Sequence, residues 1–133
     1  MDKMYLQVIS PKRIIFDGEC KVVEYNTDEG YVGVYPGHVA MTQILAPGKF
    51  TIYLEGKEPI VGVIHSGTAK IMPDVVTILA EVCEFKEEID IERAKASKER
   101  ALKRMEEKVE GFDYERAKCS LIRAEERIKV ASN

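Results

Sequence analysis

The sequence contains no tryptophan, only two histidines and three cysteines, and no apolar run near the roughly 20 residues that a membrane-spanning helix requires. Cys20, Cys83 and Cys119 are widely spaced and form no Cys-x-x-Cys pair, so we expect buried or inert thiols rather than disulfides or a zinc site. His38 and His65 have no partner at metal-ligand spacing, so neither a metal site nor a catalytic base is predicted. The N-terminus lacks the pattern of a signal peptide, which predicts a protein kept in the cytosol.

The chain also lacks the charge excess and the motifs of nucleic-acid-binding and nucleotide-hydrolysing proteins. Its net charge is −3 and its pI is near 5.5, whereas nucleic-acid binding requires a clustered basic face. The Gly-Lys pair at positions 48 and 49 is followed by Phe50 instead of Ser or Thr, so no phosphate-binding loop is present. The glycines at 30, 33 and 37 do not match the dinucleotide-binding pattern. We therefore predict no catalytic residue in this chain.

Short β-rich runs separated by turn residues occupy the first part of the chain. Pro and Gly pairs such as Pro36-Gly37 and Pro47-Gly48 separate these runs. The runs are Tyr5–Ile9, Ile14–Phe16, Cys20–Tyr25, Tyr31–Tyr35, Val39–Leu45, Phe50–Leu54, Pro59–Ile64, Thr68–Ile71 and Val75–Ala80. Asp17-Gly18 is expected to close the second of them. A turn after about every eight to twelve residues predicts an antiparallel sandwich or barrel.

The last third of the chain is richer in charge and predicts two helices. Residues 87–133 carry 12 basic and 12 acidic residues, whereas residues 1–86 carry 8 and 11. Asp90-Ile91-Glu92-Arg93-Ala94-Lys95 is repeated with one change at Asp113–Lys118, and each Asp can cap the first turn of a helix. Gly111, between the two copies, can end the first helix in a left-handed conformation.

The two predicted helices share only a thin apolar seam. The seam consists of Ala94, Ser97, Ala101, Met105 and Val109 on the first helix and of Tyr114, Ala117, Leu121, Ala124, Ile128 and Ala131 on the second. Alanine buries little area, so such a hairpin gains little stability from its own contact. It could therefore exchange between folding on itself and lying along a partner, although a static, solvated hairpin fits the composition equally well.

These patterns together predict an α+β protein with two domains. An N-terminal antiparallel β-sandwich is expected over residues 1–86, and a C-terminal antiparallel two-helix hairpin over residues 87–133.

Two sequence phrases carry a resemblance to a known family. They are Glu29-Gly30-Tyr31-Val32-Gly33-Val34-Tyr35-Pro36-Gly37-His38 in the predicted sandwich and Ile89-Asp90-Ile91-Glu92-Arg93-Ala94 at the start of the hairpin. In this order and at this distance they resemble the epsilon subunit of bacterial F-type ATP synthases, and the resemblance covers the whole chain. It implies a non-catalytic rotor subunit of a proton-translocating enzyme, which helps to couple rotation to the c-ring. The complex would be peripheral to the cytoplasmic face of the bacterial cell membrane.

The resemblance also implies partners for each domain. The sandwich is expected to pack on the gamma subunit and on the c-ring, with Gly30, Tyr31, Gly33 and His38 at this rotor interface. Tyr31 stands where the family usually has a small acidic or polar residue. The hairpin is expected to extend along gamma toward the alpha and beta subunits and to inhibit ATP hydrolysis, where its basic side chains would meet an acidic surface.

A regulatory ATP site, with or without magnesium, is a further expectation. Counted from a turn near Gly111, antiparallel packing brings Arg93, Arg100, Arg123 and Arg127 to similar heights, where their guanidinium groups could bind a triphosphate. The resemblance implies that Glu84, Ile89, Asp90 and Ala94 contact the base and the sugar. The opposing interpretation pairs these arginines with nearby glutamates on a solvated surface.

Two other functions fit the same sequence. One is a stand-alone nucleotide sensor, and the other is a structural adaptor whose hairpin binds partner helices without any ligand.

Overall fold

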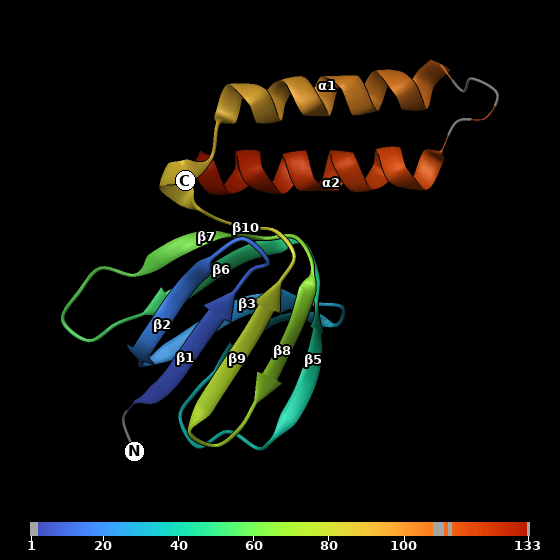
Figure 1. Ribbon diagram of the computed structural model, residues 1–133. Coiled ribbons are helices and arrows are strands. Elements are labelled where there is room, and N and C mark those ends of the chain that lie inside the picture. The colour runs from blue at the N-terminus through green and yellow to red at the C-terminus, as the bar shows by residue number, and fades with distance from the viewer. Residues whose placement is uncertain (1–2, 108–110, 112, 133) are drawn as a thin grey trace. The chain divides into compact units, whose positions relative to one another are not determined.

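The computed structural model describes residues 3–107, 111 and 113–132. It divides into two compact units, which meet in sequence between Phe85 and Lys86. Strands make up the first unit and helices the second (Figure 1).

The strands of the first unit form a sheet that folds into two layers. They are β1 (Met4–Ile9), β2 (Ile14–Cys20), β3 (Val22–Thr27), β4 (Gly30–Val34), β5 (Met41–Leu45), β6 (Gly48–Tyr53), β7 (Ile60–Ile64), β8 (Gly67–Ile71), β9 (Val75–Ala80) and β10 (Cys83–Phe85). Their order is β10-β7-β6-β3-β5-β8-β9-β1-β2, and β4 pairs with β3. Only the pair Thr27 and Leu45 joins β3 to β5, so the sheet divides there into two layers. The predicted sandwich is thereby confirmed.

Alternating side chains build the core between the layers. Leu6 and Val8 on β1 and Val76 and Ile78 on β9 are fully buried, and the residues between them point outward. Tyr25 and Phe50, from β3 and β6 in the other layer, complete the same core cluster. This period of two is what the β-rich runs of the sequence predict.

Three features of the sandwich differ from the sequence-based expectation. Strand β2 continues through Asp17-Gly18, where a turn was expected, because Asp17 and Gly18 pair with β1. Strands β1 and β9 pair in parallel, while the other pairs are antiparallel. Strand β10 was not predicted, and it lies along β7 beside Gly62. A Cβ atom at Gly62 would lie 2.2 Å from the backbone oxygen of Glu84, so this close approach requires glycine.

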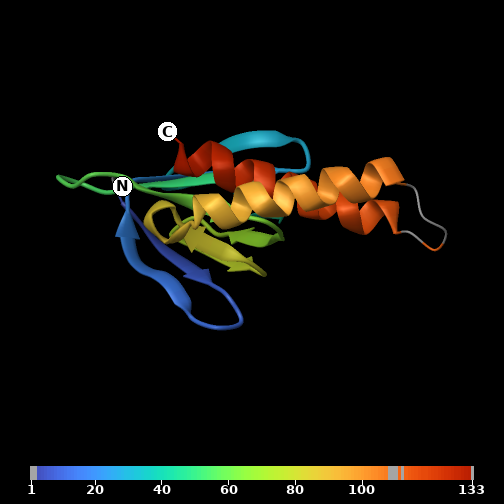
Figure 2. The same ribbon diagram turned by 90° about the horizontal axis from the view of Figure 1, so that it is seen from above.

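The second unit begins with a 3₁₀ turn (Lys86–Glu88), followed by α1 (Ile91–Glu107) and α2 (Tyr114–Ala131). Figure 1 shows α1 and α2 side by side, as expected for a helical hairpin, and in the view from above α1 passes in front of α2 (Figure 2). Asp90 Oδ1 accepts from Arg93 N at 3.1 Å, and Asp113 Oδ1 accepts from Arg116 N at 3.0 Å, so both predicted caps are confirmed. Gly111 has φ 81°, the left-handed conformation predicted for it.

The seam of the hairpin consists largely of alanines. Ala94, Ala101, Ala117 and Ala124 are at most 6 % exposed, which confirms the centre of the predicted seam. Its ends differ from the expectation. Tyr114 is 50 % exposed because it is the first residue of α2, and Val130 is buried where Ala131 was expected. The predicted seam residue Val109 lies outside the described residues.

Candidate functional site

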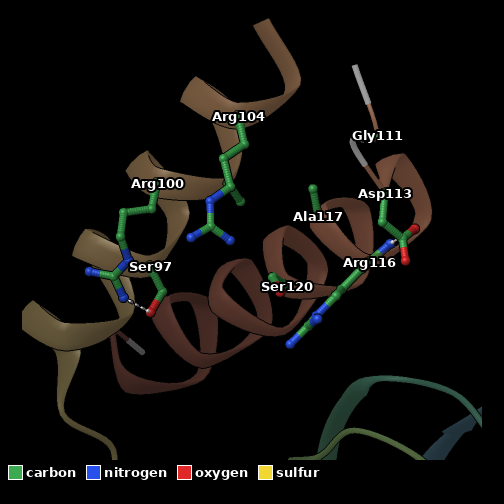
Figure 3. Close-up of a pocket in the computed structure, with 9 residues that line it drawn as sticks. Ser97, Arg100, Arg104, Gly111, Asp113, Arg116, Ala117 and Ser120 are labelled. Atoms are coloured by element: carbon green, nitrogen blue, oxygen red, sulfur yellow. Dashed lines mark hydrogen bonds between the residues drawn. The ribbon is translucent and has the colours of Figure 1, made fainter. Parts of the chain in front are cut away.

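A groove lined by arginines runs between α1 and α2 near the turn of the hairpin. Its volume is about 640 Å³. We call it the arginine groove, and its lining residues are Ser97, Arg100, Ala101, Arg104, Gly111, Asp113, Arg116, Ala117 and Ser120. Figure 3 shows Arg100 and Arg104 projecting from α1 and Arg116 from α2. The buried methyl groups of Ala101 and Ala117 lie at the contact between the helices.

Helical spacing explains why these side chains share one face. On α1, Arg93, Ser97, Arg100 and Arg104 follow one another at steps of four, three and four residues, which place them on one side of a helix. On α2 the same steps connect Arg116, Ser120, Arg123 and Arg127. The two stripes run in opposite directions along the hairpin, so the turn end of each contributes to the groove.

The arginines of the groove carry charge that the described carboxylates do not neutralise. Within the described part of the chain, Arg100, Arg104 and Arg116 form no ion pair, and the guanidinium of Arg100 donates only to Ser97 Oγ at 3.0 Å. The described lining contains one carboxylate, Asp113, which caps α2. The groove is therefore strongly cationic.

Two lysines of the hairpin, by contrast with the arginines of the groove, pair with glutamates within the described residues. Lys98 Nζ lies 4.0 Å from Glu125 on the facing helix, and Lys129 Nζ lies 3.6 Å from Glu126. Both pairs line a separate hollow of about 360 Å³. The opposing interpretation expected surface glutamates to pair with arginines. In these two ion pairs the glutamates pair with lysines instead.

The structure separates the residues predicted to bind nucleotide into several environments. Arg100 lines the arginine groove, whereas Arg93, Arg123 and Arg127 are not among the described residues that line it. These three lie farther along the same stripes. Seven residues separate Arg93 from Arg100 and Arg116 from Arg123, or roughly 10 Å along a helix axis.

The predicted base and sugar contacts have structural roles of their own. Asp90 caps α1, and Ala94 is 3 % exposed in the hairpin seam. Ile89 is half-buried just before α1. Glu84 belongs to β10 in the first unit, where its Oε1 lies 3.9 Å from Nε2 of the buried His65.

The predicted rotor residues occur on β4 and in the loop after it. Tyr31 is 59 % exposed, and its hydroxyl accepts from the backbone N–H of Lys49 at 3.2 Å. Tyr31 and Gly33 line a shallow hollow of about 400 Å³, and Gly30 begins the same strand. His38 is half-buried in the following loop, with Nδ1 2.9 Å from the carbonyl oxygen of Val39.

Two thiols and one tyrosine of the sandwich are buried in its core. Burial raises the pKa of Cys20 to about 11 and the pKa of Tyr25 to about 12. The Tyr25 hydroxyl donates to Gln43 Oε1 at 2.6 Å. Cys83 is also buried, but Cys119 is exposed on α2. The described residues contain no group of three side chains that could hold a metal ion and no helix that could span a membrane.

Sequence reasoning missed Arg104 and Arg116 as site residues. The signal for Arg116 was present, because it occupies in the second copy of the repeated phrase the place of Arg93 in the first. Arg104 could have been found from the steps of four, three and four residues that both helices share.

Comparisons with known proteins match both units. The β-sandwich domain of the ATP synthase delta/epsilon chain matches residues 3–86, and the long α-helix domain of the same chain matches residues 87–132. An ATP synthase epsilon chain of Ruminiclostridium cellulolyticum is 39% identical over 132 residues, 99% of this chain and 98% of that one. One of Halalkalibacterium halodurans is 36% identical over 98% of both chains.

A solved structure agrees with these relatives. A chain in the mitochondrial ATP synthase of Euglena gracilis, solved as OSCP, F1 and c-ring, has a TM-score of 0.88 at 25% identity, and the match covers 100% of this chain and 83% of that one. A chain from the central stalk and c-ring of the Tetrahymena thermophila enzyme shares the fold, with a TM-score of 0.60 at 11% identity. Since the family's two domains account in order for residues 3–132, this chain belongs to the delta/epsilon chain family of ATP synthases.

Proposed function

We propose that this chain is a non-catalytic central-stalk subunit of a proton-translocating F-type ATP synthase, whose hairpin inhibits ATP hydrolysis. The relatives are named as epsilon chains, and one structural neighbour is described as a central stalk with its c-ring. In this proposal the sandwich binds the gamma subunit and the c-ring, and the complex is peripheral to the cytoplasmic face of the cell membrane. Catalysis belongs to other subunits.

The observation that carries the inhibitory role is the alanine seam of the hairpin. The fully buried side chains at the centre of the contact between α1 and α2 are four alanines, and Lys98–Glu125 adds an exposed ion pair. An exposed pair contributes under about 1 kcal/mol. A contact this thin allows a partner to compete for the seam, since a binding difference of a few kcal/mol shifts such an equilibrium.

The extended hairpin would present its arginines to other subunits. Arg100, Arg104 and Arg116 of these stripes form no ion pair within the described residues. Such stripes suit an acidic surface on the alpha and beta subunits, because complementary charge directs association.

Binding of ATP to the folded hairpin is the regulatory part of the proposal. Arg93, Arg100, Arg123 and Arg127 lie on the two facing stripes, and guanidinium groups bind phosphate oxygens through paired hydrogen bonds. A ligand that binds only the folded hairpin stabilises it by RT ln(1 + [L]/Kd). ATP would therefore hold the hairpin away from its inhibitory position.

Reconstitution tests the inhibition. The full chain and a variant that lacks residues 88–133 are each assembled with alpha, beta and gamma chains, and incorporation is checked by gel filtration. We expect faster ATP hydrolysis with the truncated chain. Equal rates from equally incorporated chains would refute the inhibitory role.

Isothermal titration of the full chain with ATP tests the nucleotide site. We expect binding that Arg93→Gln and Arg123→Gln each weaken, while Lys95→Gln, which removes an exposed charge from α1, leaves it nearly unchanged. Repeating the titration without magnesium shows whether the cation takes part. Absence of heat for the full chain would remove the nucleotide site and favour a hairpin that responds to partners alone.

A further inference from the structure

We propose that the arginine groove is a separate anion site, which binds a short inorganic polyphosphate such as triphosphate and needs no nucleoside. The proposal goes beyond the ATP site above, because Arg104 and Arg116 do not belong to the residues proposed for nucleotide. Arg100 is common to both sets.

The size and position of the groove fit a small ligand. Its volume of about 640 Å³ lies in the range typical of small-molecule pockets. The lining comes from both helices near the turn, and the buried Ala101 and Ala117 hold the helices close at this point. A ligand here would bridge α1 and α2 and add to the thin contact between them.

The positive charge of the groove favours binding of a multivalent anion. Three guanidinium groups, two from α1 and one from α2, line the groove, and none forms an ion pair within the described residues. Like charges held together raise the energy of the folded hairpin, and a bound anion reverses the sign of that interaction. The first turn of α2, which also lines the groove, adds the positive end of a helix dipole.

The donors of the groove suit phosphate oxygens. Each guanidinium offers a planar fork of N–H groups that matches two oxygens of a phosphate. The hydroxyls of Ser97 and Ser120 lie in the same lining, and Ser97 Oγ already accepts from Arg100, which leaves its own proton to donate. Two forks about one turn apart on α1 and a third at the start of α2 favour a chain of linked phosphates over a single one.

Nothing in the described lining selects a nucleoside. The described residues contribute guanidinium, hydroxyl, carboxylate and methyl groups, and they include no aromatic ring on which a base could stack. The groups that the described lining does offer, guanidinium and hydroxyl, bind phosphate oxygens. The source of the anion can be free polyphosphate or the phosphate end of a nucleotide, and competition between the two distinguishes these sources.

Calorimetric titration of the full chain with sodium triphosphate tests the site. We expect the double variant Arg104→Gln/Arg116→Gln to weaken binding about tenfold or more, because hydrogen bonds between charged groups are the strong ones. The matched control is Lys103→Gln/Lys118→Gln, which removes two charges from the same helices at exposed positions outside the lining. It should change affinity by less than about threefold, as expected for screened surface charges.

A conservative pair keeps the test decisive if the glutamine variant unfolds. Arg104→Lys/Arg116→Lys retains both charges and helix-forming side chains but loses the planar forks, so triphosphate binding should still weaken by more than the lysine control. Circular dichroism verifies that helix content is unchanged. The proposal would be overturned if triphosphate did not bind the full chain. It would also be overturned if Arg104→Gln/Arg116→Gln and the control Lys103→Gln/Lys118→Gln lost equal affinity for triphosphate.

The ATP titration separates this proposal from the nucleotide site. If triphosphate binds through Arg104 and Arg116 while ATP binds no better than triphosphate, the proposed polyphosphate site is supported and the proposed nucleotide site is refuted. If ATP binds and triphosphate does not, the proposed polyphosphate site is refuted and the proposed nucleotide site is supported.

Discussion

Enlarging one seam alanine should open the hairpin. Ala124 is 1 % exposed, so a leucine at this position has no solvent-facing space and must push α1 and α2 apart. Adding carbon to a filled contact typically costs about 1–3 kcal/mol. At about 1.4 kcal/mol per factor of ten, this cost shifts the closed-to-open ratio by roughly 5- to 150-fold.

Hydrogen exchange of the full chain measures the effect. In Ala124→Leu we expect the amides of the hairpin to exchange faster by roughly the same 5- to 150-fold, because exchange follows the open population. The amides of the sandwich should keep their rates. Lys118→Leu adds similar apolar volume at an exposed position of α2, so it should leave the hairpin protected.

Two results would refute the reasoning. Unchanged hairpin exchange in Ala124→Leu would mean that the seam is not the contact that holds the helices together. Equal acceleration in Lys118→Leu would mean that leucine acts through helix propensity or aggregation instead of packing. If the seam does control opening, the reconstituted complex with Ala124→Leu should also hydrolyse ATP more slowly than one with the unchanged chain.

Three further predictions concern the sandwich and the thiols. Gly62→Ala should lower the free energy of unfolding by about 1–3 kcal/mol, measured in urea, because the added Cβ meets the backbone of Glu84, and an unchanged midpoint would contradict this packing. In the native chain, Cys119 alone should react rapidly with Ellman's reagent, and all three thiols should react after unfolding; a second fast native thiol would be inconsistent with the burial seen here. Burial raises the pKa of Cys20 from 9.0 to about 11 and that of Tyr25 from 10.0 to about 12, so the unfolded chain loses these protons first. The stability that these groups contribute should be complete below about pH 9 and should fall as the pH rises toward about 12, and urea midpoints at pH 8 and pH 11 would be equal if this were wrong.

Local patterns in the sequence predicted the hairpin well. Asp90 and Asp113 precede runs without Gly or Pro, and capping depends only on residues within one helical turn. The left-handed Gly111 follows from the same local chemistry. The ends of the seam were less predictable, since Val130 and Ala131 both fit a helical spacing and only packing selects between them.

Features that depend on distant contacts were not predictable in the same way. Strand β10 has only three residues and exists because Gly62 leaves room for it beside β7. Asp17-Gly18 has the composition of a turn, but pairing with β1 keeps it in a strand, which shows that tertiary context overrides local preference. The arginine groove required both helices to be in place, because no single stripe shows which of its arginines meet across the turn.

The parallel pairing of β1 with β9 has a consequence for synthesis on the ribosome. Leu6 of β1 pairs with Val76 of β9, so about 70 more residues must be synthesised before β1 can pair with β9. Contacts so distant along the chain slow folding, because the intervening loop must be closed first. Until β9 leaves the exit tunnel, the nascent chain therefore carries β1 with one of its two edges still open to other strands.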